Sequence, residues 1–525
     1  MDFIPRKSFL RVLLKFAGIF TVATLSAGAQ EKLELRPGEK QLFLDDHVIK
    51  EVHNLRQVIH RPKKISPDAI IRPEHPWENL VVQTRNAPFW DPAEQVWKLY
   101  YISFLEDEGG TANSSAQCLA ISMDGLQWTK PNLGLVEWEG SKANNIVTLH
   151  RKNRQAMSEL YHVIYDPNDV PARRYKGFFG INGRQPAVSP DGLHWQMLNT
   201  PVIPSQDESQ LIYDELGGQF LATVKHEGPY GRSAYLVTSK DFNEWTKPRM
   251  IFHADGEDQT ASRRRIAARL TDPRFAPLTV NRPADYNTDV YNLPVFPYEG
   301  IYIGTPMFFN QSGPNPAPIG NTDGFHHVEL VMSRDLIRWE RVAGRALFME
   351  NAHAGTGAYD TAQYIPANRP VRRGNELWFY HSGIKYRFHP DNVRTRPDGT
   401  KTYMSLRDSG AIYVSRLRLD GFVSLVAGEL EGALLTRPLL VKGKRLHVNA
   451  NVRSGGRLRA EVLDAAGRTV MEGFTADNSA VLADDQLGAQ LSWAGGKNLG
   501  DLAGKQVRLR FVFQQADLYG FWVTD

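Results

Sequence analysis

The chain contains a single cysteine, Cys118, among its 525 residues. A disulfide within the chain is therefore excluded, and stability must come from packing. Cys118 lies in the mostly apolar stretch 116–121 with no His or Arg beside it, which indicates a buried structural thiol rather than a reactive one.

The chain also lacks a strong charge of one sign. Its formal net charge is +4, and the first 29 residues contribute four basic groups and one acidic group to that total. The rest of the chain is therefore nearly neutral, which gives no reason to expect nucleic acid or an anionic membrane as a partner. The one local basic run, three arginines at 263–265, is interpreted as part of a solvated loop, with recognition of an acidic substrate as the alternative.

Long hydrophobic runs are missing after the N-terminus. Residues 1–29 are predicted to be a signal peptide, because basic residues precede the apolar run 16–25 and small residues at 27–29 fit a cleavage site. No later apolar run is long enough to span a membrane. The protein is therefore expected to be secreted or periplasmic.

What the chain does contain is a recurring turn of the form Ser-x-Asp-x-x-x-Trp. The clear copies begin at Ser122, Ser189, Ser239 and Ser333, and a degenerate copy lies around 415–422. In each copy the Ser and Asp side chains can hydrogen-bond the local backbone into a turn, and the Trp that follows can anchor it. A strand-like apolar run precedes every copy.

The repeats predict an all-β fold with a five-bladed β-propeller. The Trp anchors are separated by roughly fifty to ninety-odd residues, so each repeated unit holds about four strands with loops of varying length. Such sheets close radially and leave only short edges. Two stacked β-sandwiches with similar turns are the alternative.

The length is too great for one hydrophobic core, and the turn motif stops near Gly421. Residues 75–420 are therefore assigned to the propeller. Residues 421–525, with alternating strands such as 507–513, are predicted to form a C-terminal β-sandwich. Residues 30–74 are expected to be an opening segment that packs on the propeller.

Three segments carry a resemblance to a known superfamily: 41–46 (Gln-Leu-Phe-Leu-Asp-Asp), 288–293 (Thr-Asp-Val-Tyr-Asn-Leu), and 507–511 with 516–519. They resemble secreted bacterial propeller proteins of the glycoside hydrolase family 32/43-like superfamily, which have a C-terminal β-sandwich. The resemblance implies an enzyme that hydrolyses O-glycosyl bonds. The Trp-x-Asn-Asp-Pro-Asn-Gly, Arg-Asp-Pro and Glu-Cys motifs of family 32 are absent, which disfavours fructan as the substrate.

Candidate site residues follow from the repeat, because the innermost strands of a propeller line one central funnel. Counting back six positions from the residue that ends each predicted inner strand selects one position per blade. The five positions are Arg85, Leu160, Glu208, Tyr291 and Asp360, and their neighbours are Asn86, Tyr161, Asp207, Asp289 and Thr361.

Glycoside hydrolysis needs one protonated and one ionised carboxyl group at the scissile bond. Glu208 is predicted to be the proton donor, since the resemblance to family 43 implies an acid from the third blade. Asp360 and Asp289 are the candidates for the ionised partner, with the pair at 45–46 as the rival. The predicted substrate contacts are Arg85, Asn86, Tyr291, Trp90, Asp207 and Asp46.

Other interpretations stay open from the sequence. Each acid could be a turn or surface residue, and the protein could be a non-catalytic carbohydrate-binding propeller. A polysaccharide lyase would depend more on Tyr291 and Arg85 than on the acids. No catalytic metal or cofactor is implied, although a structural calcium ion bound by funnel carboxylates is left open. The expected partner is a carbohydrate, and the oligomeric state is undetermined.

Overall fold

The computed structural model describes residues 33–106, 113–150, 159–316, 320–395 and 398–525. The predicted signal peptide at 1–29 lies outside these residues. Within the described part of the chain, no helix has the length and apolar character needed to cross a membrane.

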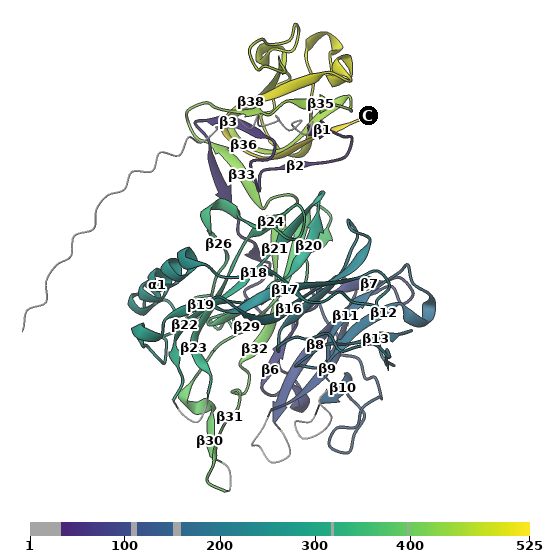
Figure 1. Cartoon of the computed structure of the whole chain (residues 1–525), viewed down its shortest axis with the longest axis vertical. Coiled ribbons are helices and arrows are strands. Elements are labelled where there is room, and N and C mark those ends of the chain that lie inside the picture. The colour runs from purple at the N-terminus through teal and green to yellow at the C-terminus, as the bar shows by residue number, and fades with distance from the viewer. Residues whose placement is uncertain (1–32, 107–112, 151–158, 317–319, 396–397) are drawn as a thin grey trace, which may run out of the picture.

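Five blades of mainly antiparallel strands form a propeller in the lower part of the molecule (Figure 1), which confirms the predicted fold class. Each blade follows its neighbour in chain order, as the predicted repeat requires.

The first three blades contain the following strands: β6 (Val81–Gln83), β7 (Phe89–Asp91), β8 (Val96–Glu106), β9 (Asn113–Ser122) and β10 (Ile146–His150); β11 (Leu160–Tyr165), β12 (Tyr175–Phe179), β13 (Gln185–Ser189) and β14 (Gln196–Met197); β15 (Ser209–Asp214), β16 (Gln219–Gly228), β17 (Gly231–Ser239) and β18 (Arg249–Phe252).

The fourth blade is divided into two four-stranded sheets. Pro294 and Pro306 lie at the points of division, and proline cannot donate a hydrogen bond to a ladder. Its strands are β19 (Asn287–Asn292), β20 (Val295–Tyr298), β21 (Ile301–Gly304), β22 (Met307–Pro314), β23 (Thr322–Glu329), β24 (Val331–Ser333), β25 (Glu340–Arg341) and β26 (Leu347–Met349).

The fifth blade closes the ring. It contains β27 (Gln363–Pro366), β28 (Val371–Arg373), β29 (Glu376–Ile384) and β32 (Gly410–Arg418), and the hairpin β30 (Val393–Thr395) and β31 (Lys401–Tyr403) projects from it. Its strand β32 pairs with β5 (Lys63–Lys64) from the N-terminal segment and with β6 of the first blade. The first and last blades therefore share one sheet.

The recurring turns form the local hydrogen bonds that the sequence predicts. In the third copy, Asp241 Oδ1 accepts from the backbone N–H groups of Asn243 and Glu244 at 2.8 and 2.9 Å, and these bonds hold the Asp241 pKa at about 2. Trp245 Nε1 donates to the carbonyl of Phe242 at 3.3 Å. The other three clear copies make the same set of bonds, so these Asp residues are structural.

The second copy of the turn contains Gly192, at a position where only glycine fits. Gly192 has φ of +78°, and a Cβ there would overlap the hydroxyl of Tyr100 and lie 2.9 Å from the ring of Tyr175. Gly218 has φ of +59° with no atom within 4 Å of a Cβ. We expect Gly218→Ala to lower the free energy of unfolding by about 1–2 kcal/mol, and Gly192→Ala by about 1–3 kcal/mol more. Denaturant unfolding of both variants measures the difference, and equal losses would show that the overlap is relieved.

The connection between the third and fourth blades contains a helix, α1 (Gly256–Thr271), so the interpretation of 263–265 as a loop was wrong. Asp255 caps the helix by accepting hydrogen bonds from its first turn, and Asp258 bonds back to the Asp255 N–H. This capping box was readable in the sequence.

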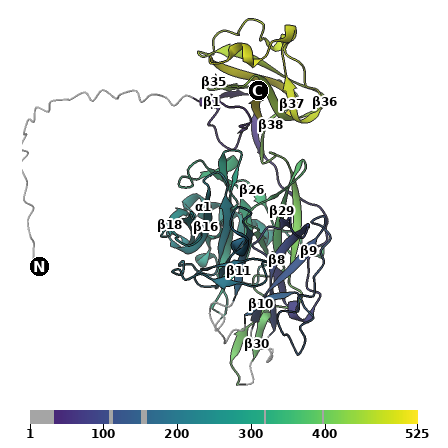
Figure 2. The ribbon, with the colours of Figure 1, turned by 90° about the vertical axis from the view of Figure 1, so that its right-hand side faces the viewer.

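The C-terminal strands form a second, ten-stranded sheet that lies above the propeller along the long axis (Figure 2). Its strands from this region are β33 (Val423–Ala427), β34 (Gly432–Thr436), β35 (Leu439–Val441), β36 (Arg445–Asp464), β37 (Asp485–Leu491) and β38 (Gln506–Thr524). The ladder between β36 and β38 is interrupted between Val452 and Arg457. The rings of Phe511 and Phe521, on either side of this interruption, lie 5.1 Å apart, so the sheet folds onto itself as a sandwich.

Residues 33–74 contribute strands to both the sandwich and the propeller. Four of their strands pair with the sandwich: β1 (Leu33–Leu35), β2 (Gln41–Leu42), β3 (Ile49–His53) and β4 (Arg56–Ile59). Only β5 completes a blade. The physical reason is that the sandwich strands β33, β34 and β35 would otherwise present unpaired edges.

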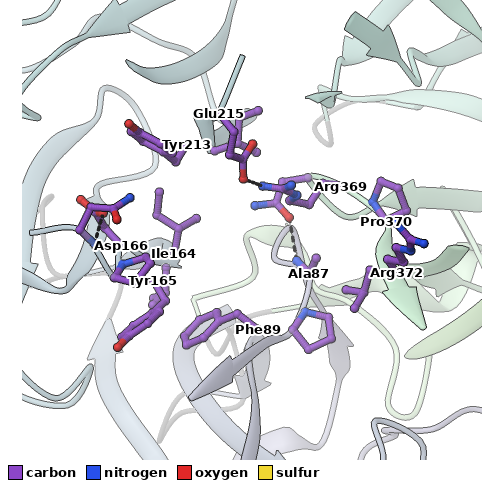
Figure 3. A pocket seen from close by; sticks show the side chains of 17 residues that line it. Ala87, Phe89, Ile164, Tyr165, Asp166, Tyr213, Glu215, Arg369, Pro370 and Arg372 are labelled. Carbon is purple, nitrogen blue, oxygen red and sulfur yellow. Dashed lines mark hydrogen bonds and ion pairs between the residues drawn. The ribbon is translucent and has the colours of Figure 1, made fainter. Parts of the chain in front are cut away.

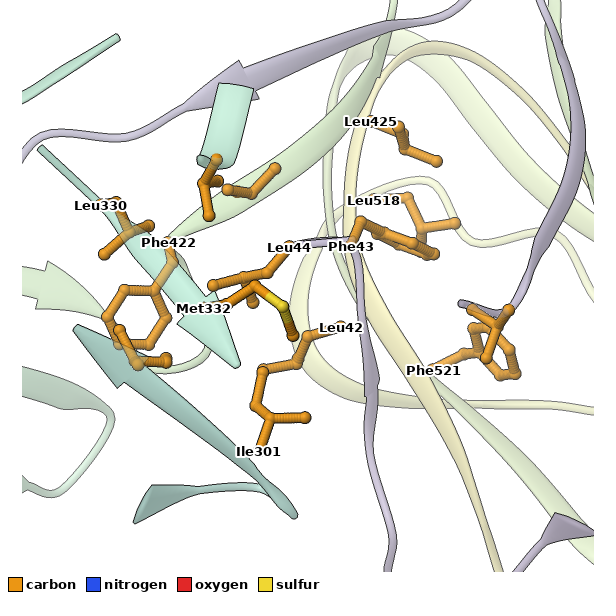
Figure 4. Close-up of a cluster of buried hydrophobic side chains, with 14 of the residues drawn as sticks. Leu42, Phe43, Leu44, Ile301, Leu330, Met332, Phe422, Leu425, Leu518 and Phe521 are labelled. Atoms are coloured by element: carbon orange, nitrogen blue, oxygen red, sulfur yellow. The ribbon is translucent and has the colours of Figure 1, made fainter. Parts of the chain in front are cut away.

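The two parts share one hydrophobic cluster (Figure 4). Leu44 lies beside Met332 of the fourth blade, while Phe43 lies beside Leu518 of the sandwich. At the rim of this cluster, Lys40 Nζ contacts Asp420 at 2.9 Å and Glu299 at 2.8 Å. The segment after β2 therefore joins the sandwich to the propeller.

Candidate functional site

The inner strands of all five blades surround one cavity of about 190 Å³. One polar or aromatic side chain comes from the inner edge of each blade: Gln83, Tyr161, Glu208, Tyr291 and Gln363. The blades therefore converge on a common axis, as the repeat predicts.

A buried ion pair crosses the cavity wall. Arg85 Nε donates to Glu208 Oε2 at 2.7 Å, and its Nη2 donates to the other carboxylate oxygen. Asn292 Nδ2 donates to Oε2 at 2.9 Å. Burial alone lowers the Arg85 pKa, but the Glu208 carboxylate outweighs that effect and raises it.

Glu208 therefore accepts three N–H hydrogen bonds, two from Arg85 and one from Asn292. Its role as the proton donor stays a prediction. A carboxyl group held by a bidentate arginine also suits a nucleophile, a base for water, or an anchor for substrate hydroxyls.

A second carboxylate, Asp207, also lines the cavity. It forms an ion pair with Lys225, whose Nζ lies 4.1 Å above the ring of Tyr291. Burial acts to raise the Asp207 pKa, but Lys225 outweighs it, so the pKa lies below its usual value. Both carboxylates that line the cavity are thus balanced by cations.

Asp289 is buried but is not among the cavity-lining residues. Its Oδ2 accepts from Arg232 Nη1 at 2.9 Å and from Gln311 Nε2 at 3.0 Å, and Arg232 lies 5.3 Å from the ring of Tyr291. Burial raises the Asp289 pKa despite Arg232. Within the described residues, its Oδ1 has no hydrogen-bond partner.

Asp360 does not line the cavity, and its partners belong to other strands of the fifth blade. Its Oδ1 accepts from Lys64 Nζ of β5 at 2.7 Å, and His381 Nε2 lies 3.9 Å from Oδ2. Burial lowers the His381 pKa, so this imidazole is neutral near pH 7. Of Glu208, Asp289 and Asp360, the structure therefore places only Glu208 in the lining of this cavity, and Asp360 is bonded to Lys64 of the outer closing strand.

The predicted substrate contacts divide into two groups. Arg85, Tyr291 and Asp207 line the cavity, whereas Asn86, Trp90 and Asp46 do not.

Each of the three residues outside the cavity has another environment. The side-chain amide of Asn86 forms two hydrogen bonds with backbone groups. Its Nδ2 donates to the Tyr100 carbonyl at 3.1 Å, and its Oδ1 accepts from the Val163 N–H at 3.0 Å. Trp90 is exposed on β7 and packs edge-to-face on Trp97. Asp46 is exposed between β2 and β3, next to the sandwich.

Aromatic faces near the axis are mostly covered by cations. Arg184 Cζ lies 4.7 Å from the centre of the Tyr161 ring, and Arg85 Cζ lies 5.8 Å from it. Tyr386, by contrast, is 38% exposed at the cavity and offers a ring for sugar stacking. It follows β29 in a connection with no repeat signal, and sequence reasoning missed it.

A further acid, Glu159, was also missed. It is buried immediately before β11, and burial raises its pKa. Among the described residues, Glu159 Oε1 has no hydrogen-bond partner. Glu159 and Asp207 both lie seven positions before the Asp that ends an inner strand, so a count of seven would have found both.

The charges that line the cavity balance, with Asp207 and Glu208 against Arg85 and Arg387. The remaining lining residues are amides, hydroxyls, aromatic rings and apolar side chains. In the part of the chain that the structure describes, no group of three or more His, Cys, Asp or Glu side chains is placed to hold a metal ion.

Comparison with known proteins finds no matching protein family and no matching curated protein. Among solved structures, the protein is similar to BT0996 in its complex with RGII, with a TM-score of 0.41 and 13% identity over 69% of this protein and 92% of that one.

Two further similar structures are enzymes by description. The GH32 β-fructofuranosidase BmSUC1 of Bombyx mori has a TM-score of 0.38 and 9% identity, covering 88% of this chain and 94% of that one. A structure described under the GH130 mannoside phosphorylases and glycoside hydrolases has a TM-score of 0.38 and 12% identity, covering 71% and 95%.

Proposed function

We propose that the protein is a glycoside hydrolase that binds a neutral sugar in the axial cavity. The observation that supports this most is Glu208, a buried carboxylate held by Arg85 and Asn292 where the five blades meet. Amide side chains and the Tyr386 ring around it suit sugar hydroxyls and a sugar face. The balanced lining charge favours a neutral glycan over the uronate that a lyase requires.

In this proposal Glu208 is the ionised carboxyl group. It attacks the anomeric carbon directly or removes a proton from the attacking water, while the glycosidic oxygen leaves with a proton from a second carboxyl group. Glu159 and Asp289 do not line the cavity, but each is a buried carboxyl group two positions before a lining tyrosine, Tyr161 and Tyr291. Burial raises the pKa of both, and they are the candidates for that donor. The pH–rate profiles of Glu159→Gln and Asp289→Asn identify which of the two residues is the donor. The variant that lacks the donor should lose the alkaline limb of its profile.

The proposal predicts that Glu208→Gln lowers turnover by about 10²–10⁴-fold, since an amide can neither attack nor accept a proton. Binding of the sugar should persist. The measurement is product release from a polysaccharide panel, with calorimetry on the same samples.

A matched control is Glu78→Gln. Glu78 is also buried and is ion-paired with Lys130 at 2.7 Å, but it does not line the cavity. It should change stability and leave turnover intact. Full activity in Glu208→Gln would contradict the proposed role.

A non-catalytic carbohydrate-binding propeller is the second candidate. The observation in its favour is that both cavity-lining carboxylates, Asp207 and Glu208, are already neutralised by cations. Heat of binding without any released sugar from the unmodified protein would support this candidate.

A further inference from the structure

A second cavity lies among the far ends of the inner strands (Figure 3). It measures about 340 Å³, which falls in the range of about 300–1,000 Å³ that small-molecule sites occupy. Its walls come from the far ends of the inner strands, at 163–168 and 212–215, and from 87–89 and 368–372. It shares no lining residue with the first cavity.

Buried amides separate the two cavities. Asn368 accepts from the Ala87 N–H and donates to the Leu211 carbonyl, both at 2.8 Å. Asn86 accepts from the Val163 N–H. The Asn86 bond joins the first blade to the second. The two Asn368 bonds join the fifth blade to the first and to the third. A ligand in one cavity therefore does not contact the residues of the other.

Two tyrosines form one side of the second cavity. Tyr165 and Tyr213 are half-buried, and edge-to-face contacts with Tyr175 and Phe220 hold their rings at centroid distances of 5.3 and 5.1 Å. Among the described residues, neither hydroxyl has a hydrogen-bond partner. A fixed ring with a free polar tip suits an amphipathic ligand such as a sugar.

In Figure 3, Glu215 lies near Tyr213 and forms an ion pair with Arg369. Arg369 Nη1 contacts Glu215 Oε1 at 2.8 Å, with side-chain exposures of 36% and 55%. Exposed ion pairs contribute little to stability, so both groups can exchange their bond for ligand hydroxyls. Arg372 and Asp166 complete the charged lining, which is balanced overall.

We propose that this second cavity is a carbohydrate-binding site for a neutral pyranose unit. Tyr213 supplies the ring face, and Arg369 with Glu215 supplies paired donors and acceptors for neighbouring hydroxyls. This site is independent of the reaction proposed for the first cavity, so it stands whether or not that cavity is catalytic. Because the two cavities share no lining residue, they bind separate glycan segments.

The test measures binding of galactobiose, mannobiose, xylobiose and cellobiose to the intact protein by calorimetry, with hydrogen exchange to locate each site. A bound disaccharide should protect the amides of 163–168 and 212–215. Arg369→Ala and Tyr213→Ala should each weaken this binding about tenfold or more. Tyr213→Phe should retain most of the affinity, since the ring is kept.

Two controls make the result specific. Arg457→Ala removes a pair of similar exposure in the sandwich, with Glu431 at 3.0 Å, and should leave binding unchanged. Tyr386→Ala should weaken binding at the first cavity only. The proposal is overturned if no disaccharide binds, if protection is confined to the first cavity, or if Arg369→Ala and Tyr213→Ala bind as the unmodified protein does.

Discussion

Replacing Arg85 by methionine is expected to lower the free energy of unfolding by about 3–5 kcal/mol, because it leaves the buried Glu208 carboxylate without its cation. The side chains of Arg85 and Glu208 are only 3% and 4% exposed, so water cannot replace the lost bonds. Turnover should fall as well, since Glu208 then lacks the contacts that fix its orientation. Denaturant unfolding and product release measure the two effects.

Two further variants distinguish the contribution of charge from that of bidentate geometry to the stability of the Arg85–Glu208 pair. Arg85→Lys keeps the charge but loses the bidentate geometry, so we expect a smaller loss of stability. The double variant Arg85→Met/Glu208→Leu removes both charges and should recover much of the stability, without activity. If Arg85→Met alone were as stable as the unmodified protein, the ion pair would not be the contact that holds Glu208.

Replacing Lys64 by methionine is expected to lower the free energy of unfolding by about 2–4 kcal/mol. Asp360 is 1% exposed and would lose the cation that lies 2.7 Å away. The expected loss is smaller than at Arg85, because Lys64 itself is 24% exposed. Since β5 is the outer strand of the fifth blade, hydrogen exchange in β32 should also increase.

The adjacent Lys63 provides the matched control. It is exposed on the same two-residue strand, and Lys63→Met should change the free energy of unfolding by no more than about 0.5 kcal/mol. Equal effects of the two substitutions would show that the loss arises from the strand's charge and not from the Lys64–Asp360 contact.

The sequence repeat predicted some of the residues that line the axial cavity and missed others. The count of six positions selected Arg85, Glu208 and Tyr291, which line the cavity, but also Leu160 and Asp360, which do not. In the second blade the pairing register shifts between Leu160 and His162, so Tyr161 lines the cavity instead. Successive strand side chains point to opposite faces, and a shift of one residue exchanges them.

In the fifth blade the inner strand begins only at Gln363, and Asp360 precedes it. The repeat selected Arg85, which lies 123 positions from Glu208, but it did not show that the two side chains pair. It did not select Lys64, which lies 296 positions from Asp360. Whether a carboxylate is paired with a cation or free to act depends on such distant partners.

The amino-acid sequence by itself determined the blades, because each Ser-x-Asp-x-x-x-Trp turn is built from hydrogen bonds among residues a few positions apart. It also determined that the inner strands converge, since repeated sheets that cannot bury both faces alone close around an axis. Only the tertiary structure decided which acids reach the cavity and which strands the N-terminal segment joins. Those outcomes depend on register shifts, unpaired strand edges and ion pairs between residues far apart in the chain, and these exist only once the blades have packed.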